Sequence, residues 1–352
     1  EKGVECYEAL KGEGALVFHP WSTGITYQLI PKATADGISV HSVGYGRTSA
    51  KNGEVFRWVF NYPANYWDGA SIAIKHILDE EGGSLDGKKI ALVYHNSAFG
   101  KEPIRTLEEL GKMHGYELIL LPVDHPGQEQ KSQWLQIRRE RPDYVVMWGW
   151  GAMNAGAITE AVKTKFPMDH FIGVWWSGHD ADLDLVGEEG KGYKSISWSF
   201  PELDAPVMAD IKKYVVDPGN SQSNEKEMQG VFYGRGLVIS MILAEGIKAA
   251  QDHFGTAAID ATQLRWGLEN LDVTEERLAE LGMTGMVPPF KTSCSDHTGH
   301  SGGWMLEWDG AKFVKVSDLL KPETDAIAAL EVEKAKEYAD ANAPWPMNDD
   351  CN

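Results

Sequence analysis

The sequence predicts an α/β fold with two domains built on parallel β-sheets. With 352 residues, of which 43% are hydrophobic and 24% are charged, the chain can bury a sizeable core and is long enough for two domains. Between residues 15 and 193, short apolar segments alternate with segments of helical length. Strands and helices that alternate strictly, with short links, require parallel sheets and right-handed crossovers.

The most informative strand is the apolar run from Tyr144 to Met147. It is short, rich in β-branched residues and bounded by proline and glycine, as expected of a strand buried on both faces of a parallel sheet. Ligands of open α/β sheets bind beyond the carboxyl ends of the strands. Trp148 and Trp150, which follow the run, are therefore predicted to lie where a small molecule is held.

The other elements of this part follow from hydrophobic periodicity and from turn residues. Strands are predicted at residues 15–18, 38–42, 56–62, 88–94, 117–123, 171–176 and 195–200. Helices are predicted before residue 12 and at residues 25–36, 65–78, 103–114, 131–139 and 155–165.

The pattern changes after residue 193. A largely helical region is followed by short β-type segments and a charged helix, with helices predicted at 205–214, 226–254, 262–271 and 325–342 and strands at 290–293, 304–308 and 313–317. The tail, 343–352, has two prolines and a run of acidic and amide residues. We expect it to be poorly ordered unless Cys351 ties it down.

The charge balance argues against several classes of partner. Lys+Arg 33 against Asp+Glu 52 gives a net charge of −19, and no basic run could follow a phosphate backbone, so nucleic acid and anionic membrane surfaces are not expected partners. No apolar segment approaches the roughly 20 residues of a membrane helix, so we expect no direct membrane insertion. Residues 1–14 have the pattern of an amphipathic helix, and we expect no signal peptide in this chain.

The three cysteines, Cys6, Cys294 and Cys351, share no metal-type spacing. Their odd number leaves at least one without a partner inside the chain. Cys6 and Cys351 lie near the chain ends and could be bridged in an oxidising compartment, whereas Cys294 is expected to be a buried or idle thiol. The sequence does not fix the connectivity.

Two consecutive strands end in loops that combine hydroxyls, glycine and an aromatic residue. The first loop carries Trp21, Ser22 and Thr23, and the second carries Tyr45 and Arg47. Glycine permits close backbone approach and a helix start offers free N–H groups, so each loop could hold a carboxylate or carbonyl of a ligand. A tight turn with an N-cap Ser or Thr explains either loop, taken alone, equally well.

The order of these elements resembles the type I periplasmic solute-binding proteins of the leucine/isoleucine/valine family, which deliver ligands to ABC importers. The motifs that carry the resemblance extend over nearly the whole chain: Trp21-Ser22-Thr23-Gly24, Gly44-Tyr45-Gly46, Tyr94 to Gly100, Phe171-Ile172-Gly173, Gly187 to Tyr193 and Phe232-Tyr233. A Trp-rich branch looks closest, judging by Trp148 to Gly151, Gly173 to Gly178, Arg265 to Leu271 and Ser293 to His297. The resemblance implies two Rossmann-like lobes of parallel sheet flanked by helices, joined by a hinge that the chain crosses three times.

The resemblance also implies where the lobes begin and end. The first lobe is expected at 1–60 plus 201–284, the second at 61–200 plus 285–324, and a C-terminal helix and tail at 325–352. Family members begin with a strand, a helix and a second strand before the segment that matches residues 1–11. We therefore expect an N-terminal segment, some ligand contacts and a partner for Cys6 to be missing from this sequence.

The loops expected to face the cleft follow from the same resemblance. The expected ligand-binding residues are Trp21, Ser22, Thr23, Tyr45 and Arg47 from the first lobe, Asn96, Phe99, Trp148, Trp150, Trp176, His179 and Asp180 from the second, and Tyr233 from the long helix. In amino-acid binders an acidic residue of the last loop meets the ligand ammonium, and here the nearest acid is displaced to Asp180. Arg235, close to Tyr233, either reaches the cleft or pairs with one of the many carboxylates.

The aromatic residues shape the ligand hypothesis. Tryptophan faces stack on planar or cationic groups, so we expect a planar, aromatic or heteroaromatic ligand, with a carboxylate as an optional group, rather than leucine. A branched-chain amino acid or amide is the alternative. Because side chains alternate along a strand, Trp148 and Trp175 can instead point into the core while Trp150 and Trp176 reach the cleft.

No catalytic constellation is apparent in the sequence. It has no nucleophile with a base and no paired carboxylates in one loop, and its short glycine motifs lack the third glycine and downstream acid of a dinucleotide fingerprint. The run Asp296-His297-Thr298-Gly299-His300 is expected to be structural, near the hinge, rather than a metal site.

We therefore expect neither enzymatic activity nor a cofactor. The preferred function is that of a monomeric periplasmic receptor that closes on a solute and is recognised by a membrane permease. A two-domain α/β enzyme and a ligand-sensing receptor domain remain the alternatives.

Overall fold

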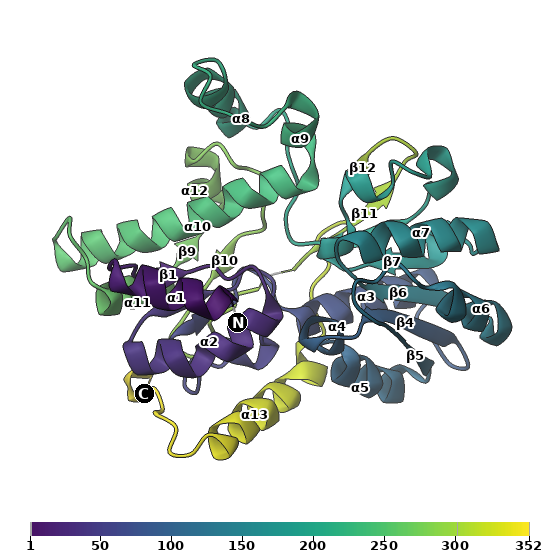
Figure 1. Ribbon diagram of the computed structural model, residues 1–352, viewed down its shortest axis with the longest axis horizontal. Coiled ribbons are helices and arrows are strands. Elements are labelled where there is room, and N and C mark those ends of the chain that lie inside the picture. The colour runs from purple at the N-terminus through teal and green to yellow at the C-terminus, as the bar shows by residue number, and fades with distance from the viewer. Residues whose placement is uncertain (1, 301, 352) are drawn as a thin grey trace.

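Two β-sheets organise the chain, one in each of two α/β lobes (Figure 1). The computed structural model describes residues 2–300 and 302–351. The first sheet has the order β1-β2-β3 and the second the order β12-β11-β8-β7-β6-β4-β5. The expected fold class, two lobes of mostly parallel sheet flanked by helices, is confirmed.

The first lobe contains the smaller sheet, whose parallel strands are β1 (Val17–Phe18), β2 (Ser39–His41) and β3 (Val59–Phe60). Its other elements are α1 (Lys2–Gly12), α2 (Thr23–Asp36), α10 (Val231–Phe254), α11 (Ala261–Glu269), α12 (Glu275–Glu280) and the antiparallel pair β9 (Asp272–Val273) and β10 (Phe290–Lys291). The Ser22 side chain caps the start of α2, and Gly37 ends it with a φ of 66°, a left-handed conformation that suits glycine.

The second lobe contains the larger sheet. Its parallel strands are β4 (Lys89–His95), β5 (Glu117–Val123), β6 (Tyr144–Trp148), β7 (Phe171–Gly173) and β8 (Lys194–Ser197), and β11 (Trp304–Trp308) and β12 (Phe313–Lys315) extend it antiparallel. The helices that flank it are α3 (Tyr66–Glu80), α4 (Ala98–Lys101), α5 (Ile104–His114), α6 (Lys131–Glu140) and α7 (Ala152–Thr164). Side chains of β6 alternate between the two faces of this sheet. Val146 packs with α3 and α5, and Val145 and Met147 pack with α6 and α7.

Several expected elements end earlier or divide. The strand expected at 171–176 ends at Gly173, because the chain turns into a 3₁₀ helix at Trp175–Ser177 that is closed by a 2.7 Å bond from the Ser177 N–H to the Val174 carbonyl. The helix expected at 226–254 is two helices, α9 (Glu225–Gln229) and α10, because Gly230 between them is extended. The segment expected at 205–214 is α8 (Pro206–Ile211) followed by a π-helical turn, Lys212–Val216. Only Val59–Phe60 of the strand expected at 56–62 is regular.

Hydrogen bonds tie two of the hinge segments together. The Asn61 N–H donates to the His297 carbonyl at 3.2 Å, and the Thr298 hydroxyl donates to the Asn61 side chain. The His300 ring lies 3.0 Å from the buried carboxylate of Asp68. The histidines of this stretch therefore hold the crossover in place, in agreement with the structural use expected for them. Since β10 pairs with β9, we propose that the first lobe extends to Asp296 and that the return crossover is at 297–303.

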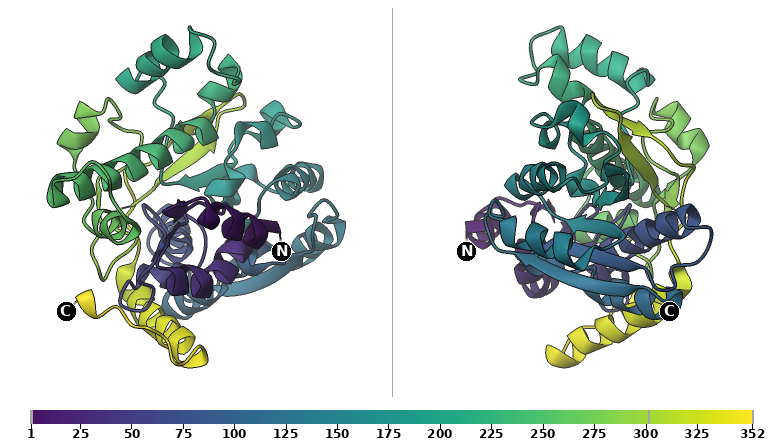
Figure 2. Two further views of the ribbon diagram at one scale, coloured as in Figure 1. Left: turned by 60° about the vertical axis from the view of Figure 1, so that its left-hand side comes forward. Right: turned by 90° about the vertical axis from the view of Figure 1, so that its right-hand side faces the viewer.

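The C-terminal segment runs along the outside of both lobes. Helix α13 (Thr324–Ala341) packs against α3 and α5 of the second lobe and against residues 48–51 of the first, and the tail then reaches the first lobe (Figures 1 and 2). The Trp345 indole N–H donates to the Val55 carbonyl at 2.6 Å, and the backbone N–H of the buried Asn348 donates to the Glu54 carbonyl at 2.7 Å.

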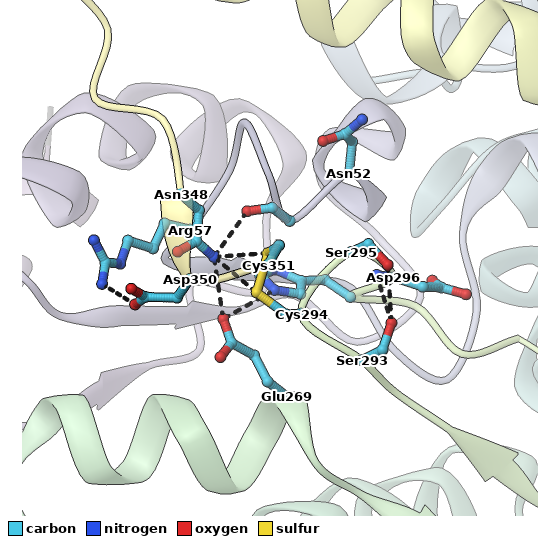
Figure 3. The surroundings of a disulfide bond; sticks show 12 residues. Asn52, Arg57, Glu269, Ser293, Cys294, Ser295, Asp296, Asn348, Asp350 and Cys351 are labelled. Carbon is cyan, nitrogen blue, oxygen red and sulfur yellow. Dashed lines mark hydrogen bonds and ion pairs between the residues drawn. A yellow bond between two sulfur atoms is a disulfide. The ribbon is translucent and has the colours of Figure 1, made fainter.

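A disulfide between Cys294 and Cys351 ties this tail to the first lobe (Figure 3). The expectation that Cys294 is an idle thiol is therefore wrong, and the partner of Cys351 is Cys294 rather than Cys6, which is free and exposed. Asp350 beside the disulfide pairs with Arg57 (Figure 3). It also pairs with Arg265 at 2.8 Å. The tail is therefore held in place, with Cys351 as the residue that ties it down.

Candidate functional site

An aromatic cluster lies where the two lobes meet, at the carboxyl ends of their strands. It consists of Trp21, Tyr45, Tyr66, Trp148, Trp175, Trp176, Trp198 and Phe232, and we call it the interlobe aromatic cluster. Trp21 and Tyr45 follow β1 and β2 of the first lobe, whereas Trp148 ends β6, Trp175 and Trp176 follow β7, and Trp198 follows β8. The carboxyl ends of both sheets thus face one region, as in other α/β proteins that bind small molecules.

On the first-lobe side, short hydrogen bonds fix the two predicted loops against each other. The Tyr45 hydroxyl accepts a 2.8 Å bond from the Trp21 N–H, and the Thr23 hydroxyl accepts a 3.2 Å bond from the Gly46 N–H. The Ser22 hydroxyl caps α2. Trp21 itself has a φ of 51° and is 56% exposed, so its ring extends from the lobe and stacks on Tyr45 at 6.1 Å.

Trp176 occupies the centre of the cluster. Its ring centroid lies 6.2 Å from those of both Trp21 and Tyr45 across the interface, and 6.0 Å from that of Phe232 on α10. Its indole N–H donates a 2.9 Å hydrogen bond to the Tyr66 hydroxyl. Trp176 is only half-buried, and its contacts with the first-lobe rings are all edge-to-face.

The lobes also approach closely through Gly44. The Trp175 indole N–H donates a 2.6 Å hydrogen bond to the Gly44 carbonyl. A Cβ at Gly44 would lie 2.5 Å from the indole nitrogen of Trp198, closer than real Cβ contacts, so only glycine fits here. The backbone φ of Gly44, 65°, is a left-handed conformation that also favours glycine.

A polar network holds the tryptophan loops of the second lobe. The Asn154 amide donates to the Trp176 carbonyl and to the Asp182 carboxyl, both at 2.8 Å, and the Ser177 hydroxyl donates to the Gly149 carbonyl at 2.8 Å. Burial raises the pKa of Asp182 to about 7, despite the opposing hydrogen bond from Asn154. The loops that carry Trp150 and Trp176 are therefore fastened to each other by buried and partly buried hydrogen bonds.

The tryptophans of these loops differ in burial. Trp148 and Trp175 are 0% and 1% exposed and pack with Tyr66 in the core, whereas Trp150 is 54% exposed. Two of this set contact the first lobe: Trp176 through the rings of Trp21 and Tyr45, and Trp175 through its hydrogen bond to the Gly44 carbonyl. Phe99 also packs on Tyr66, at 5.3 Å, and so supports the cluster from behind.

Arg47, Asn96 and Trp150 have their contacts away from the interlobe aromatic cluster. Arg47 is drawn away by the rings of Tyr27, Phe56 and Tyr338, the last at 4.7 Å from its guanidinium carbon. The exposed Asn96 donates to Asp124 at 2.7 Å, and Trp150 lies beside His95 with their ring centroids 6.4 Å apart.

The remaining predicted residues lie beside the start of α10. His179 stacks on Phe232 at 4.5 Å, and burial lowers the pKa of His179. The Asp180 carboxylate accepts from the Val231 N–H at 3.4 Å, so it faces the first turn of α10. Tyr233 is half-buried next to Phe232 in the same turn.

Arg235 and Trp198 belong to this region although they are not among the predicted binding residues. Arg235 is 1% exposed, and its guanidinium carbon lies 5.1 Å from the ring centroids of Trp176, Trp198 and Phe232. The spacing of Phe232 and Arg235, three residues apart on one helix, places them on one face. Trp198 follows β8 at the same carboxyl edge of the sheet as Trp148, so its position after a predicted strand could have indicated it as a site residue.

Two further findings concern the whole of the described chain. Among residues 2–300 and 302–351, no group of three or more His, Cys, Asp or Glu side chains is arranged to hold a metal ion. None of the helices in those residues is long and apolar enough to cross a membrane.

Comparisons with known proteins agree on one family. A family model described as periplasmic binding protein matches residues 1–312. A solved structure described as an ABC transporter permease from the Pseudomonas fluorescens group is 34% identical with a TM-score of 0.92, over 100% of this chain and 86% of the other. No match was found among proteins with curated annotation.

More distant structures share the fold. A branched-chain amino acid ABC transporter from Thermus thermophilus with bound valine is 18% identical, with a TM-score of 0.73, over 90% of this chain and 80% of the other. A solute-binding protein of an ABC transporter from R. palustris, in complex with benzoate, is 19% identical, with a TM-score of 0.69, over 91% and 82% of the two chains.

Proposed function

The chain belongs to the periplasmic binding protein family, and from this membership we propose that it binds a small aromatic solute between its lobes for delivery to an ABC permease. Members of this family are extracytoplasmic solute-binding proteins rather than enzymes. The disulfide between Cys294 and Cys351 supports an oxidising, extracytoplasmic location. The proposed working form is a monomer, which light scattering on the purified protein tests.

The observation that carries the ligand class is the interlobe aromatic cluster. Trp21 and Tyr45 approach Trp176 from the opposite lobe at centroid distances of 6.2 Å, so flat ring faces and edges line the contact. Aromatic pairs prefer offset or edge-to-face arrangements, each worth about 0.5–1.5 kcal/mol beyond area burial. A planar ring between these side chains would continue the same packing.

The two acidic residues nearest the expected ammonium position, Asp180 and Asp182, are poorly suited to bind an amino acid. Asp180, the nearest acid to the position that meets a ligand ammonium in amino-acid binders, accepts from the Val231 N–H at the start of α10. Asp182 carries a pKa raised by burial to about 7, so only about half of this group is charged at neutral pH. Neither supports tight binding of an ammonium group, so an aromatic solute is preferred over the branched-chain amino acid alternative.

Tryptophan fluorescence tests this function. Titration with aromatic acids, benzoate among them, is expected to give saturable quenching, because tryptophans of both lobes meet in the cluster. Replacing Trp176→Ala should weaken that binding, whereas Trp266→Ala, which removes a ring stacked on His253 in the first lobe, should not. Tight binding of leucine or valine with no response to aromatic probes would overturn the aromatic proposal.

A further inference from the structure

Arg235 brings a positive charge to the interface between the lobes. It comes from α10 of the first lobe, while its hydrogen-bond acceptors belong to the end of the second-lobe sheet: the Trp175 carbonyl at 2.8 Å and the hydroxyls of Ser197 and Ser199, both at 3.2 Å. A guanidinium has five N–H donors, and these bonds use one from each nitrogen. Two N–H groups, one on each terminal nitrogen, remain for another acceptor.

This cation is buried without an anion. Arg235 is 1% exposed and forms no ion pair with any carboxylate in the described part of the chain. Arg265 gives the contrast within the same protein: it is 4% exposed, also faces a tryptophan, and pairs with Glu269 at 3.0 Å and Asp350 at 2.8 Å. A buried charge without a partner is costly, and proteins rarely keep one without a use.

An unused hydrogen-bond donor lies beside the Arg235 guanidinium. The indole nitrogen of Trp198 is buried and has no hydrogen-bond partner among the described residues. The Trp198 ring is one of the three that surround the Arg235 guanidinium. Buried N–H groups are nearly always satisfied, so the unpaired Trp198 N–H beside an unpaired cation indicates an acceptor that comes from outside the chain.

We propose that Arg235 is the binding partner of a carboxylate on the solute, with the Trp198 indole N–H as a second donor. The inference rests on the proposed function, because it places the anionic group of the ligand beside the aromatic cluster that would hold its ring. Trp176 links the proposed carboxylate position to the aromatic cluster. Its ring centroid is 5.1 Å from the Arg235 guanidinium carbon, and its ring also approaches Trp21 and Tyr45.

The charge needed for this role is present at neutral pH. Burial lowers the pKa of Arg235 to about 9, which leaves the guanidinium mostly protonated at pH 7. Paired hydrogen bonds from a guanidinium to a carboxylate are among the strongest in proteins, and the low-dielectric surroundings strengthen them further.

The test compares acids with their primary amides on wild-type protein and on variants. Benzoate and phenylacetate are titrated by calorimetry beside benzamide and phenylacetamide, and butyrate, leucine and valine serve as aliphatic acids. We expect wild type to bind an acid at least tenfold more tightly than its amide. Arg235→Met should weaken acid binding by about 30-fold or more and leave amide binding nearly unchanged.

Two further variants control for folding and for general cation loss. Arg235→Lys keeps the charge without the planar fork and should fall between wild type and Arg235→Met. Lys315→Met removes a cation that also lies over aromatic rings but has its own carboxylate, Glu202 at 2.6 Å, and should bind acids like wild type. If Arg235→Met does not fold by circular dichroism, the wild-type ratio of acid to amide affinity and the Arg235→Lys variant still decide the matter.

The outcomes separate this inference from the proposed function. Aromatic amides that bind as tightly as the acids would overturn the carboxylate assignment and leave the aromatic solute standing. If only the aliphatic acids bind, and they bind more weakly to Arg235→Met, the result would support the carboxylate assignment and overturn the aromatic solute. Absence of binding by every acid, or equal loss of acid and amide binding in Arg235→Met, would overturn the carboxylate assignment.

Discussion

The indole N–H of Trp175 donates a 2.6 Å hydrogen bond to the backbone carbonyl of Gly44 and so joins the second lobe to the first. The two lobes can approach this closely because Gly44 has no side chain where they meet. This single position couples the backbone of a first-lobe loop to the tryptophans that line the second lobe.

Replacing Gly44→Ala is expected to separate the lobes and weaken solute binding. The added Cβ would lie 2.5 Å from the indole nitrogen of Trp198, which is 1% exposed and has little room to move. We expect a loss of about 1–3 kcal/mol in stability and roughly tenfold in affinity for an aromatic acid. Calorimetric titration and urea unfolding measure the two effects.

Gly83→Ala is the matched control for that prediction. Gly83 also has a positive φ, of 96°, but a Cβ added there would meet no heavy atom of the described residues within 4 Å, so this variant carries the backbone cost alone. If both variants bind the probe with wild-type affinity, the close approach at Gly44 has no role in binding.

Breaking the disulfide should destabilise the protein. Cys294 and Cys351 are 57 residues apart, and closure of a loop of this length restricts the unfolded chain by about 4 kcal/mol in the chain-entropy model. Cys294→Ser combined with Cys351→Ser should therefore lower the free energy of unfolding by up to that amount. Cys6→Ser, which removes an exposed free thiol, should change it by less than about 0.5 kcal/mol. Equal stability of all three proteins in urea would contradict the prediction.

Stability should depend on pH through Asp182. Burial raises its folded-state pKa from 3.8 to about 7, so between these values the folded protein binds more protons than the unfolded chain. Stability from this group is therefore fully present below about pH 4 and is lost as the pH rises toward 7, by on the order of 2–4 kcal/mol. Urea unfolding of wild type and Asp182→Asn at pH 5 and pH 8 measures the effect.

The Asp182→Asn variant should have a smaller change in stability between these two pH values, because its amide is neutral at both. Asp204→Asn, at an exposed position, controls for the loss of one negative charge and should follow the wild-type dependence. A pH dependence that is the same in Asp182→Asn and in wild type would exclude Asp182 as its source.

Removing the ring of Trp176 should weaken aromatic binding more than removing any ring in the core of one lobe. Its contacts with Trp21, Tyr45 and Phe232 are all to the other lobe, so Trp176→Ala removes packing between lobes. We expect an affinity loss of about tenfold for an aromatic acid, which corresponds to ~1.4 kcal/mol. Trp176→Phe, which retains a ring, should recover part of it, and full affinity in Trp176→Ala would contradict the central position of this ring.

The sequence predicted the fold well because its signals are local. Apolar runs such as Tyr144 to Met147, separated by helical segments, are enough to predict parallel sheets, and the position of Trp148 at a strand end follows from the same run. The direction in which each tryptophan side chain points is harder to predict from the sequence. It depends on the turn after Gly173, where the strand pattern stops and Trp175 and Trp176 enter a 3₁₀ helix.

Other parts of the site depend on contacts between distant segments. Arg235 could be placed on its helix, but only the structure shows that residues 175, 197 and 199 surround it and that none of the described carboxylates pairs with it. Arg47 lies in a loop of the kind that binds ligands. Its guanidinium nevertheless packs on the ring of Tyr338, which is distant in the sequence. The pairing of Cys294 with Cys351 likewise requires the path of α13, which periodicity cannot give.

The disulfide has a consequence for the connectivity of the whole molecule. Starting at Cys294 in the first lobe, the chain crosses the hinge, forms β11 and β12 of the second lobe, follows α13 and returns to the first lobe at Cys351. Residues 294–351 and their disulfide therefore form a covalent ring that passes through both lobes. A protease that cuts once inside this ring, for example between β12 and α13, leaves a molecule of unchanged mass apart from one added water, and its two fragments separate only after reduction.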